Sequence, residues 1–291
     1  MSDPTSLIAQ ADKLAQPASG FFSFFGGSSS TRLEDASDLY VQAANTYRLQ
    51  KNFLEAGRQF VKAAELQKKL CSFNDQANYL VEAYKCYKGV APHDAIECVA
   101  QAIRIFLTQN GQFRRAANFQ MDLAELCEGM GDVAAAAENF EKAGDYFSTD
   151  QAEALSCKAF VKAADLHATQ GNYTCAMQFY DTVIQKLAGN SLSRWALKDH
   201  FFKAALCALC LEDQVEAQKR LDAYAMEDPA FASTREFELL QDIIAVIESG
   251  TADEFADRVY EFDQFSKLDK LKTQMLLKLK NGIISQGDDL T

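Results

Sequence analysis

The chain of 291 residues is 48% hydrophobic and 24% charged, which is ordinary for a soluble protein. Its net charge of −12 at pH 7 argues against nonspecific nucleic-acid binding, because a polyanion requires a basic footprint on the protein. The longest apolar runs fall far short of the roughly 20 residues that span a bilayer, and the N-terminus lacks the basic segment and apolar core of a secretory signal.

The first distinctive stretch is PASGFFSFFGGSSS, in which phenylalanines are surrounded by glycine and serine. Four phenylalanines in five residues would normally be buried, yet the flanking glycines favour a mobile loop that can insert elsewhere. We therefore expect a hydrophobic loop at residues 20–30, and the alternative is that it folds back onto the first helical hairpin. Its phenylalanines are Phe21, Phe22, Phe24 and Phe25.

A repeat with a step of about 20 residues follows this loop. Each unit has a small residue, an apolar residue four positions later and usually alanine seven positions later, as in Ala56, Phe60 and Ala63. These offsets lie on one helix face, and the step fits one helix plus a short turn. We predict an all-α, tetratricopeptide-like stack of antiparallel helical hairpins over residues 1–188. The first positions of the units are 36, 56, 76, 95, 116, 136, 156 and 176, and the units at 76 and 116 are the weaker ones.

The repeat fails after about residue 188. The run SRWALKDHFFKAALCALCL predicts a long helix that is buried on most sides, and further helical segments follow it. We expect residues 189–291 to form a compact helical bundle that caps the array and ends in a frayed acidic tail, GDDLT.

Charge is distributed unevenly along the chain. Residues 48–115 hold eleven Lys and Arg against six Asp and Glu, and residues 212–263 hold four against fifteen. The first region is therefore net positive and the second strongly negative. This division predicts two different partners, one at each charged region, and the alternative is that these are solvated helix faces of uneven sign.

The sequence contains no recognisable catalytic constellation. Nucleotide-binding GxxxxGK, HExxH and GxSxG motifs are absent, and His93, His167 and His200 are far apart. Cys207 and Cys210 form a CxxC pair, but inside an apolar run without the turn or second pair of a redox or zinc site. We expect all eight cysteines to be free, in a reducing, cytosolic compartment, and we predict no enzymatic activity, cofactor or metal.

Several segments, taken in order, resemble one known family. They include FFSFFGGSSS, VQAANTYRLQKNFLEAG, NGQFRRAANF, SCKAFVKAADL, KDHFFKAALC, FDQFSKLDK and the terminal DDLT. Together, over nearly the whole chain, they resemble the soluble NSF attachment proteins, most closely the α-type and its fungal members, with the β-type as the alternative. The resemblance implies a twisted sheet of helical hairpins followed by a C-terminal bundle.

The same resemblance implies an adaptor in membrane traffic. Members of the family coat the four-helix SNARE bundle left after fusion and recruit the AAA+ ATPase NSF, which pulls the bundle apart. The implied partners are syntaxin-type, SNAP-25-type and synaptobrevin-type helices, NSF and the membrane surface, with no nucleic acid. The chain would then be cytoplasmic and peripherally associated with membranes, and would support vesicle fusion and intracellular protein transport.

The resemblance also assigns three groups of residues. The phenylalanine loop would contact the membrane, and the penultimate Leu290, with Asp288 and Asp289, would engage and stimulate the ATPase. A basic and apolar face would bind SNAREs, although one family lysine is replaced here by Asn118, with charge supplied nearby. The implied SNARE-binding residues are Lys51, Arg114, Arg115, Lys158, Lys162, Leu192, Trp195, Lys198 and Arg235.

Other interpretations of these features make different predictions. In one alternative, the lysines only keep the surface soluble and bind no partner. In another, the tail is disordered and Leu290 has no function. A generic helical-repeat receptor for peptide tails, such as a co-chaperone, would have a concave carboxylate clamp, but it does not explain the phenylalanine loop or the terminal leucine. An enzyme with a cryptic site would need converging polar residues, which the sequence does not reveal.

Overall fold

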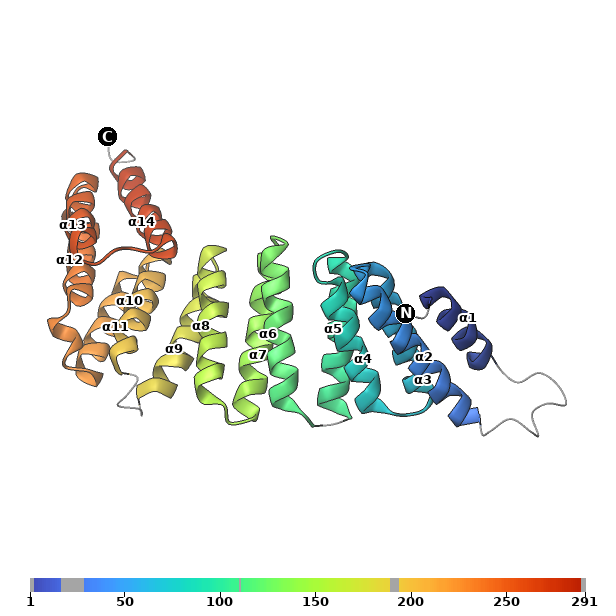
Figure 1. The fold of residues 1–291 in the computed structure, drawn as a ribbon. Coiled ribbons are helices and arrows are strands. Elements are labelled where there is room, and N and C mark those ends of the chain that lie inside the picture. The colour runs from blue at the N-terminus through green and yellow to red at the C-terminus, as the bar shows by residue number, and fades with distance from the viewer. Residues whose placement is uncertain (1–2, 17–28, 110, 189–193, 289–291) are drawn as a thin grey trace. The chain divides into compact units, whose positions relative to one another are not determined.

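The computed structural model describes residues 3–16, 29–109, 111–188 and 194–288. These residues form fourteen α-helices, a short 3-10 helix at Phe231–Ser233 and no strand, so the predicted all-α class is confirmed. The helices are α1 Pro4–Ala15, α2 Ser29–Leu49, α3 Phe53–Lys69, α4 Phe73–Tyr87, α5 Pro92–Thr108, α6 Phe113–Gly129, α7 Val133–Thr149, α8 Glu153–Thr169, α9 Tyr173–Ala188, α10 Arg194–Cys210, α11 Gln214–Glu227, α12 Arg235–Ser249, α13 Ala252–Phe265 and α14 Lys270–Asp288 (Figure 1).

Residues in the left-handed conformation mark most of the turns between successive helices. After α2, the Lys51 N–H donates to the Arg48 carbonyl (3.0 Å) and the Asn52 N–H donates to the Tyr47 carbonyl (2.9 Å), which closes the end of the helix. Lys51 has a φ of 60°. The same conformation recurs at intervals of about 20 residues, which matches the step of the sequence repeat. The residues that adopt it are Lys51, Cys71, Gly111, Gly131, Gln151, Gly171 and Glu212.

The residues of the predicted repeat face the interior. Ala56 is fully buried and Phe60 is 2% exposed. Small residues at the first position allow neighbouring helices to approach closely, and glycine next to them allows a ring to come closer still. A Cβ atom on Gly57 would lie 2.5 Å from the Tyr87 ring, so a side chain at that position would force the buried ring to move. The burial pattern confirms that the repeat encodes the packing of the stack.

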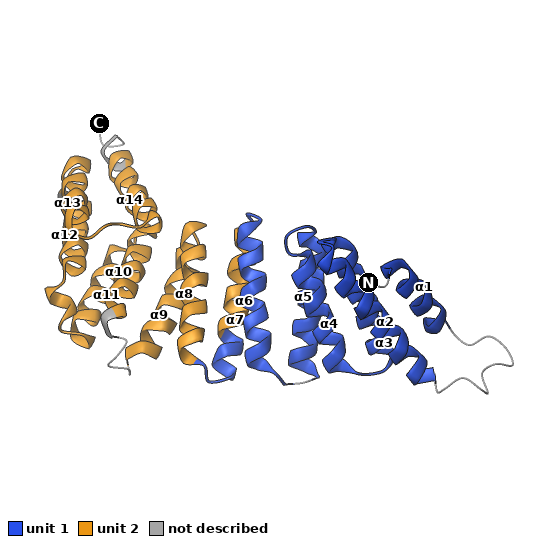
Figure 2. Cartoon of the chain, in the orientation of Figure 1, with its two compact units in different colours: residues 1–131, 145–152 blue, residues 132–144, 153–291 orange. Residues whose placement is uncertain are grey.

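The helices belong to two compact units, which have different colours in Figure 2. Unit 1 comprises Met1–Gly131 and Asp145–Ala152, and unit 2 comprises Asp132–Gly144 and Glu153–Thr291. In unit 1, each helix from α1 to α5 packs against the next one along the chain, which ends this series at α6. In unit 2, α8, α9 and α10 pack in the same sequential manner, and α10 also contacts α11, α12 and α14. The domain boundary expected after residue 188 stays a prediction.

Helix α10 is the centre of the core of unit 2. All ten residues from Phe201 to Cys210 are buried, as the sequence predicts for this helix. The surrounding hydrophobic cluster runs from Ala164 in α8 to Leu279 in α14. Cys207 and Cys210 are free thiols in this core, and burial raises the pKa of Cys210 to about 11. The two cysteines of the CxxC pair therefore pack in the core as small apolar side chains. The other six cysteines of the chain are also free thiols.

Candidate functional site

Part of the predicted site lies outside the residues that the structure describes. This holds for all four phenylalanines of the N-terminal loop, for one predicted SNARE-binding residue and for two residues of the tail. Two further predicted residues lie in described helices: Trp195 is in the first turn of α10, and Asp288 is the last residue of α14. The predicted residues outside the described ranges are Phe21, Phe22, Phe24, Phe25, Leu192, Asp289 and Leu290.

Three predicted basic residues lie in unit 1, in two different environments. Lys51 is exposed in the turn after α2, and Arg114 is exposed in the first turn of α6, where it pairs with Asp150 at 2.5 Å. Arg115 is half-buried, with its guanidinium 4.3 Å from the centre of the Phe106 ring. It also donates a hydrogen bond to Oδ1 of Asn78 in α4 (2.6 Å). Lys51 and Arg114 thus reach solvent, whereas Arg115 holds α6 against its neighbours.

Lys158 and Lys162 lie one turn apart on the exposed face of α8 in unit 2. The opposite face carries Cys157 and Phe160, which are 7% and 4% exposed. Neither lysine forms an ion pair with a carboxylate in the described part of the chain, so both charges are unneutralised. Leu155 is 41% exposed on the turn before Lys158. Sequence reasoning missed this leucine, although its position off the alanine pattern and three residues before a predicted lysine is a usable signal.

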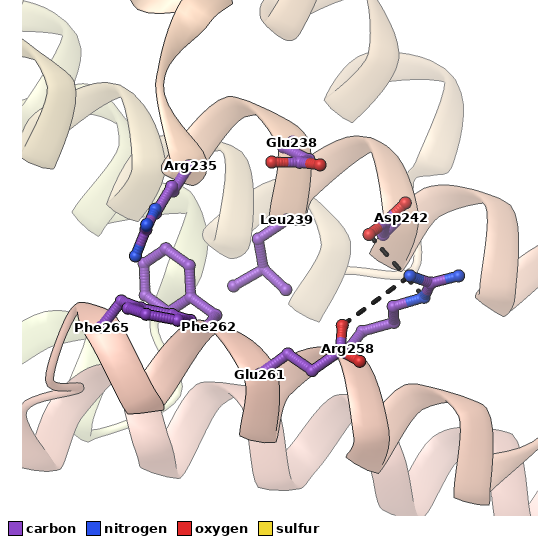
Figure 3. Close-up of a pocket in the computed structure, with 8 residues that line it drawn as sticks. All are labelled: Arg235, Glu238, Leu239, Asp242, Arg258, Glu261, Phe262 and Phe265. Carbon is purple, nitrogen blue, oxygen red and sulfur yellow. Dashed lines mark ion pairs between the residues drawn. The ribbon is translucent and has the colours of Figure 1, made fainter.

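Lys198 and Arg235 come together at the start of α12 in unit 2. The Nζ atom of Lys198 lies 2.9 Å from Oε1 of Glu236, the residue that follows Arg235. The Arg235 guanidinium lies 4.1 Å from the centre of the Phe265 ring in α13, which is a cation–π contact. Figure 3 shows Arg235 and Phe265 at one side of a pocket of about 210 Å³ between α12 and α13, with Arg258 at the other side.

The surface of α12 and α13 is acidic. Arg258 lies 3.8 Å from Asp242 and 3.9 Å from Glu261, so even this cation is largely offset by its neighbours (Figure 3). The negative region that the sequence predicts over residues 212–263 is therefore displayed on these helices. The exposed carboxylates on them are Glu238, Glu248, Asp253, Glu254, Asp257 and Glu261.

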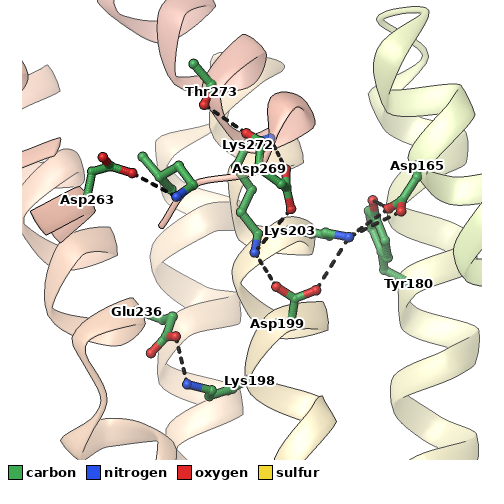
Figure 4. A network of polar contacts seen from close by, with 11 residues as sticks. Asp165, Tyr180, Lys198, Asp199, Lys203, Glu236, Asp263, Asp269, Lys272 and Thr273 are labelled. Atoms are coloured by element: carbon green, nitrogen blue, oxygen red, sulfur yellow. Dashed lines mark hydrogen bonds and ion pairs between the residues drawn. The ribbon is translucent and has the colours of Figure 1, made fainter. Parts of the chain in front are cut away.

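A network of polar side chains joins four helices of unit 2 (Figure 4). Lys203 in α10 lies 3.0 Å from Asp165 in α8 and 3.4 Å from Asp199, and the Tyr180 hydroxyl of α9 donates to Asp165 (2.6 Å). Lys272 of α14 pairs with Asp199. Burial raises the pKa of Asp199, but Lys203 and Lys272 outweigh that effect, and its pKa lies below the usual value. The network attaches both α8, with its exposed lysines, and α14, which leads to the tail, to α10.

The described residues were also compared with the requirements of a metal site and of a membrane-spanning helix. Within these ranges, no group of three or more His, Cys, Asp or Glu side chains is arranged to hold a metal ion. A search of the same ranges finds no helix whose length and hydropathy suit a bilayer crossing.

Comparisons with known proteins give a consistent result over the whole chain. The sequence profile of the family described as "Soluble NSF attachment protein, SNAP" matches residues 2–284. The chain is 45% identical to the vesicular-fusion protein SEC17 of Komagataella phaffii, over 100% of this chain and 98% of that protein. It is 44% identical to the alpha-soluble NSF attachment protein of Saccharomyces cerevisiae, over 100% of both chains. It is 33% identical to the human protein of the same name, over 99% of this chain and 97% of that one.

Proposed function

The chain belongs to the soluble NSF attachment protein family, and we propose that it is an adaptor that binds the post-fusion SNARE four-helix complex at membranes. It recruits the AAA+ ATPase NSF to this complex and stimulates the ATPase to disassemble it, which supports vesicle fusion and intracellular protein transport. The adaptor contributes binding surfaces, and the chemistry of ATP hydrolysis belongs to the ATPase.

The exposed lysine pair of α8 is the observation that carries this proposal. Lys158 and Lys162 have no ion-pair partner among the described carboxylates, and Leu155 adds an exposed apolar side chain on the preceding turn. Such a surface recognises an acidic helical bundle through electrostatic steering and complementarity, without a deep pocket. We therefore place the main SNARE contact of unit 2 on α8.

The remaining predicted basic residues contribute to the proposed SNARE surface either directly or indirectly. Lys51 and Arg114 of unit 1 and Lys198 and Arg235 of unit 2 supply further positive side chains near solvent. Arg115 acts indirectly, since its guanidinium is engaged with a ring and an amide inside unit 1. Trp195, in the first turn of α10, and Leu192, which lies outside the described residues, complete the proposed set.

The acidic helices α12 and α13 are proposed to face the ATPase, together with the tail residues Asp288, Asp289 and Leu290. Support comes from the row of exposed carboxylates on these helices. It also comes from the polar network, which fixes the start of α14 to the core through Lys272. The tail then extends from an anchored helix, so that Leu290 can act on the ATPase after the acidic surface has docked.

A reconstitution tests this function directly. The purified chain is mixed with fluorescently labelled, assembled SNARE complexes, NSF and ATP. The complexes are expected to come apart only when the chain is present, because the adaptor links the ATPase to its substrate. Disassembly at the same rate without the chain, or no disassembly with it, would reject the proposed function.

The phenylalanine loop is proposed to attach the adaptor to the membrane. Burying one phenylalanine side chain contributes roughly 1.5–3 kcal/mol, so partial insertion of four rings gives weak attachment without a lipid anchor. Replacing Phe21 and Phe22 by serine is expected to abolish co-flotation with liposomes. Phe53→Ser with Phe73→Ser, which removes two rings that are 38% and 37% exposed in unit 1, is the control and retains flotation. Unchanged flotation of the loop variant contradicts the assignment.

A further inference from the structure

A second pocket lies in unit 1, where α3, α4 and α5 pack side by side. Its volume is about 350 Å³. Its lining includes buried residues of α4, among them Gln76 and Tyr87, which are 8% and 5% exposed. None of the residues assigned to SNARE, ATPase or membrane contact lines it, so any role of this pocket is independent of the function proposed above.

The rim of the pocket is negatively charged. Glu65 of α3 and Asp94 and Glu97 of α5 are exposed around it. None of these carboxylates has an ion-pair partner within the ranges that the structure describes, and Glu97 accepts only a 3.3 Å hydrogen bond from the amide of Gln101. Lys68 is the only cationic side chain among the described residues that line the pocket. The carboxylates thus outnumber the cation, and their charges are not neutralised locally.

Gln76 supplies an independent indication of a ligand. This side chain is nine-tenths buried and lines the pocket, yet its amide has no hydrogen-bond partner among the described residues. The amide atoms of Gln76 are not enclosed by protein, so they are open to the pocket and available to a ligand there. Gln76 also occupies the first position of a repeat unit, where most other units have a fully buried alanine. A polar partner in the pocket would satisfy this amide.

We propose that the pocket binds a cationic side chain, lysine or arginine, from an extended segment of a partner protein. A volume of about 350 Å³ is at the lower end for ligand sites and suits one or two long side chains better than a large cofactor. An ammonium or guanidinium group donates hydrogen bonds to Glu65 and Glu97, and the Gln76 carbonyl accepts another. The methylene groups of the cationic side chain pack on Leu80 and Tyr87.

Two titratable groups in the wall are consistent with a negative potential in the pocket. Burial raises the pKa of the Cys98 thiol to about 12, and the Glu97 and Asp94 carboxylates add to this shift. Burial likewise raises the pKa of Tyr87 to about 12, with Asp94 among the further causes. Both groups are therefore neutral near pH 7. The charge that faces a ligand comes from the three carboxylates and Lys68.

Fluorescence anisotropy with labelled peptides tests this proposal on the full chain. The probe is a short fluorescein-labelled peptide in which arginine alternates with glycine and serine, and counterparts carry lysine or glutamate instead. The arginine or lysine probe is expected to bind and the glutamate probe is not. Replacing Glu65 and Glu97 by glutamine is expected to weaken binding by about tenfold or more. Lys68→Gln is expected to tighten binding, because it removes the opposing charge.

The control removes the same number of charges elsewhere in unit 1. Glu34→Gln with Asp35→Asn changes two exposed carboxylates of α2 that do not line the pocket, and this variant is expected to bind within about twofold of the wild type. Gln76→Leu keeps the net charge and is expected to weaken binding, because it removes the carbonyl that accepts a hydrogen bond from the cationic group. The proposal is overturned if neither cationic probe binds, if the glutamate probe binds equally, or if the α2 control loses as much affinity as the pocket variant.

Discussion

Replacing Lys158 and Lys162 by glutamate is expected to weaken binding to an assembled SNARE four-helix complex by about 10- to 100-fold. Both side chains are exposed on one face of α8 and have no described carboxylate partner, so their charges are free to act on a ligand. Charge reversal replaces two attractions by two repulsions, while the buried face of α8 is untouched. A pull-down with immobilised complex, repeated at increasing salt, measures the loss.

A matched variant separates this local effect from a change in net charge. Lys219→Glu with Lys270→Glu also reverses two exposed lysines in unit 2, on α11 and α14. We expect it to bind the SNARE complex nearly as well as the wild type. Retained binding by the α8 variant, or an equal loss in the control, contradicts the assignment of the SNARE contact to α8. Circular dichroism melting of all three proteins verifies that they are folded.

Truncating Lys203 to alanine is expected to destabilise unit 2 by about 2 kcal/mol. The side chain of Lys203 is 7% exposed and lies between Asp165 and Asp199. Its removal leaves Asp165 with the Tyr180 hydroxyl and Asp199 with Lys272, both weaker arrangements for carboxylates that are only 32% and 40% exposed. This costs more than the loss of a fully exposed pair. The loss is measured by urea unfolding, followed by the fluorescence of Trp195, the single tryptophan of the chain. This signal reports on unit 2 because Trp195 and Lys203 both lie in α10.

An exposed lysine of unit 2 provides the comparison. Lys219 has a side chain that is 79% exposed, and its contact with Glu216 is long, at 3.8 Å. Lys219→Ala is expected to change stability by less than about 0.5 kcal/mol. A loss below about 1 kcal/mol for Lys203→Ala would show that the network does not hold α8 and α14 to α10.

The same network gives unit 2 a pH dependence of defined sign. The pKa of Asp199 is lower in the folded protein than its ordinary value, because Lys203 and Lys272 outweigh the effect of burial. The stabilisation from this carboxylate is therefore fully present above its unfolded pKa, about 4, and is lost as the pH falls through the folded value. Removing Lys203 takes away part of that shift, so the variant loses less additional stability in acid than the wild type does.

The packing of the stack could be predicted from the sequence because it depends on local periodicity. The small, apolar and alanine positions recur every 20 residues or so, and such a repeat can bury its faces only as stacked helices. Ala56 and Phe60 are buried as predicted. The exposed lysines of α8 follow from the same helical spacing, since Lys158 and Lys162 lie off the buried positions.

The environment of individual charged residues could not be predicted, because it depends on contacts between distant parts of the chain. Arg115 is partly withdrawn from solvent by Phe106 and by Asn78, and Lys198 is paired with Glu236, 38 residues away. Sequence spacing carries no information on such pairs. The pocket of unit 1 does have a signal in the sequence, because Gln76 occupies a repeat position that holds alanine or serine in every other unit.

The most direct test of the central claim compares Leu290→Ala with the wild type in the reconstituted disassembly reaction. The account places SNARE binding on the helical units and stimulation of the ATPase in the tail. The variant is therefore predicted to bind SNARE complexes with unchanged affinity and yet to fail to support their ATP-dependent disassembly by NSF. Disassembly by Leu290→Ala at the wild-type rate, or loss of SNARE binding in this variant, would contradict that division of labour.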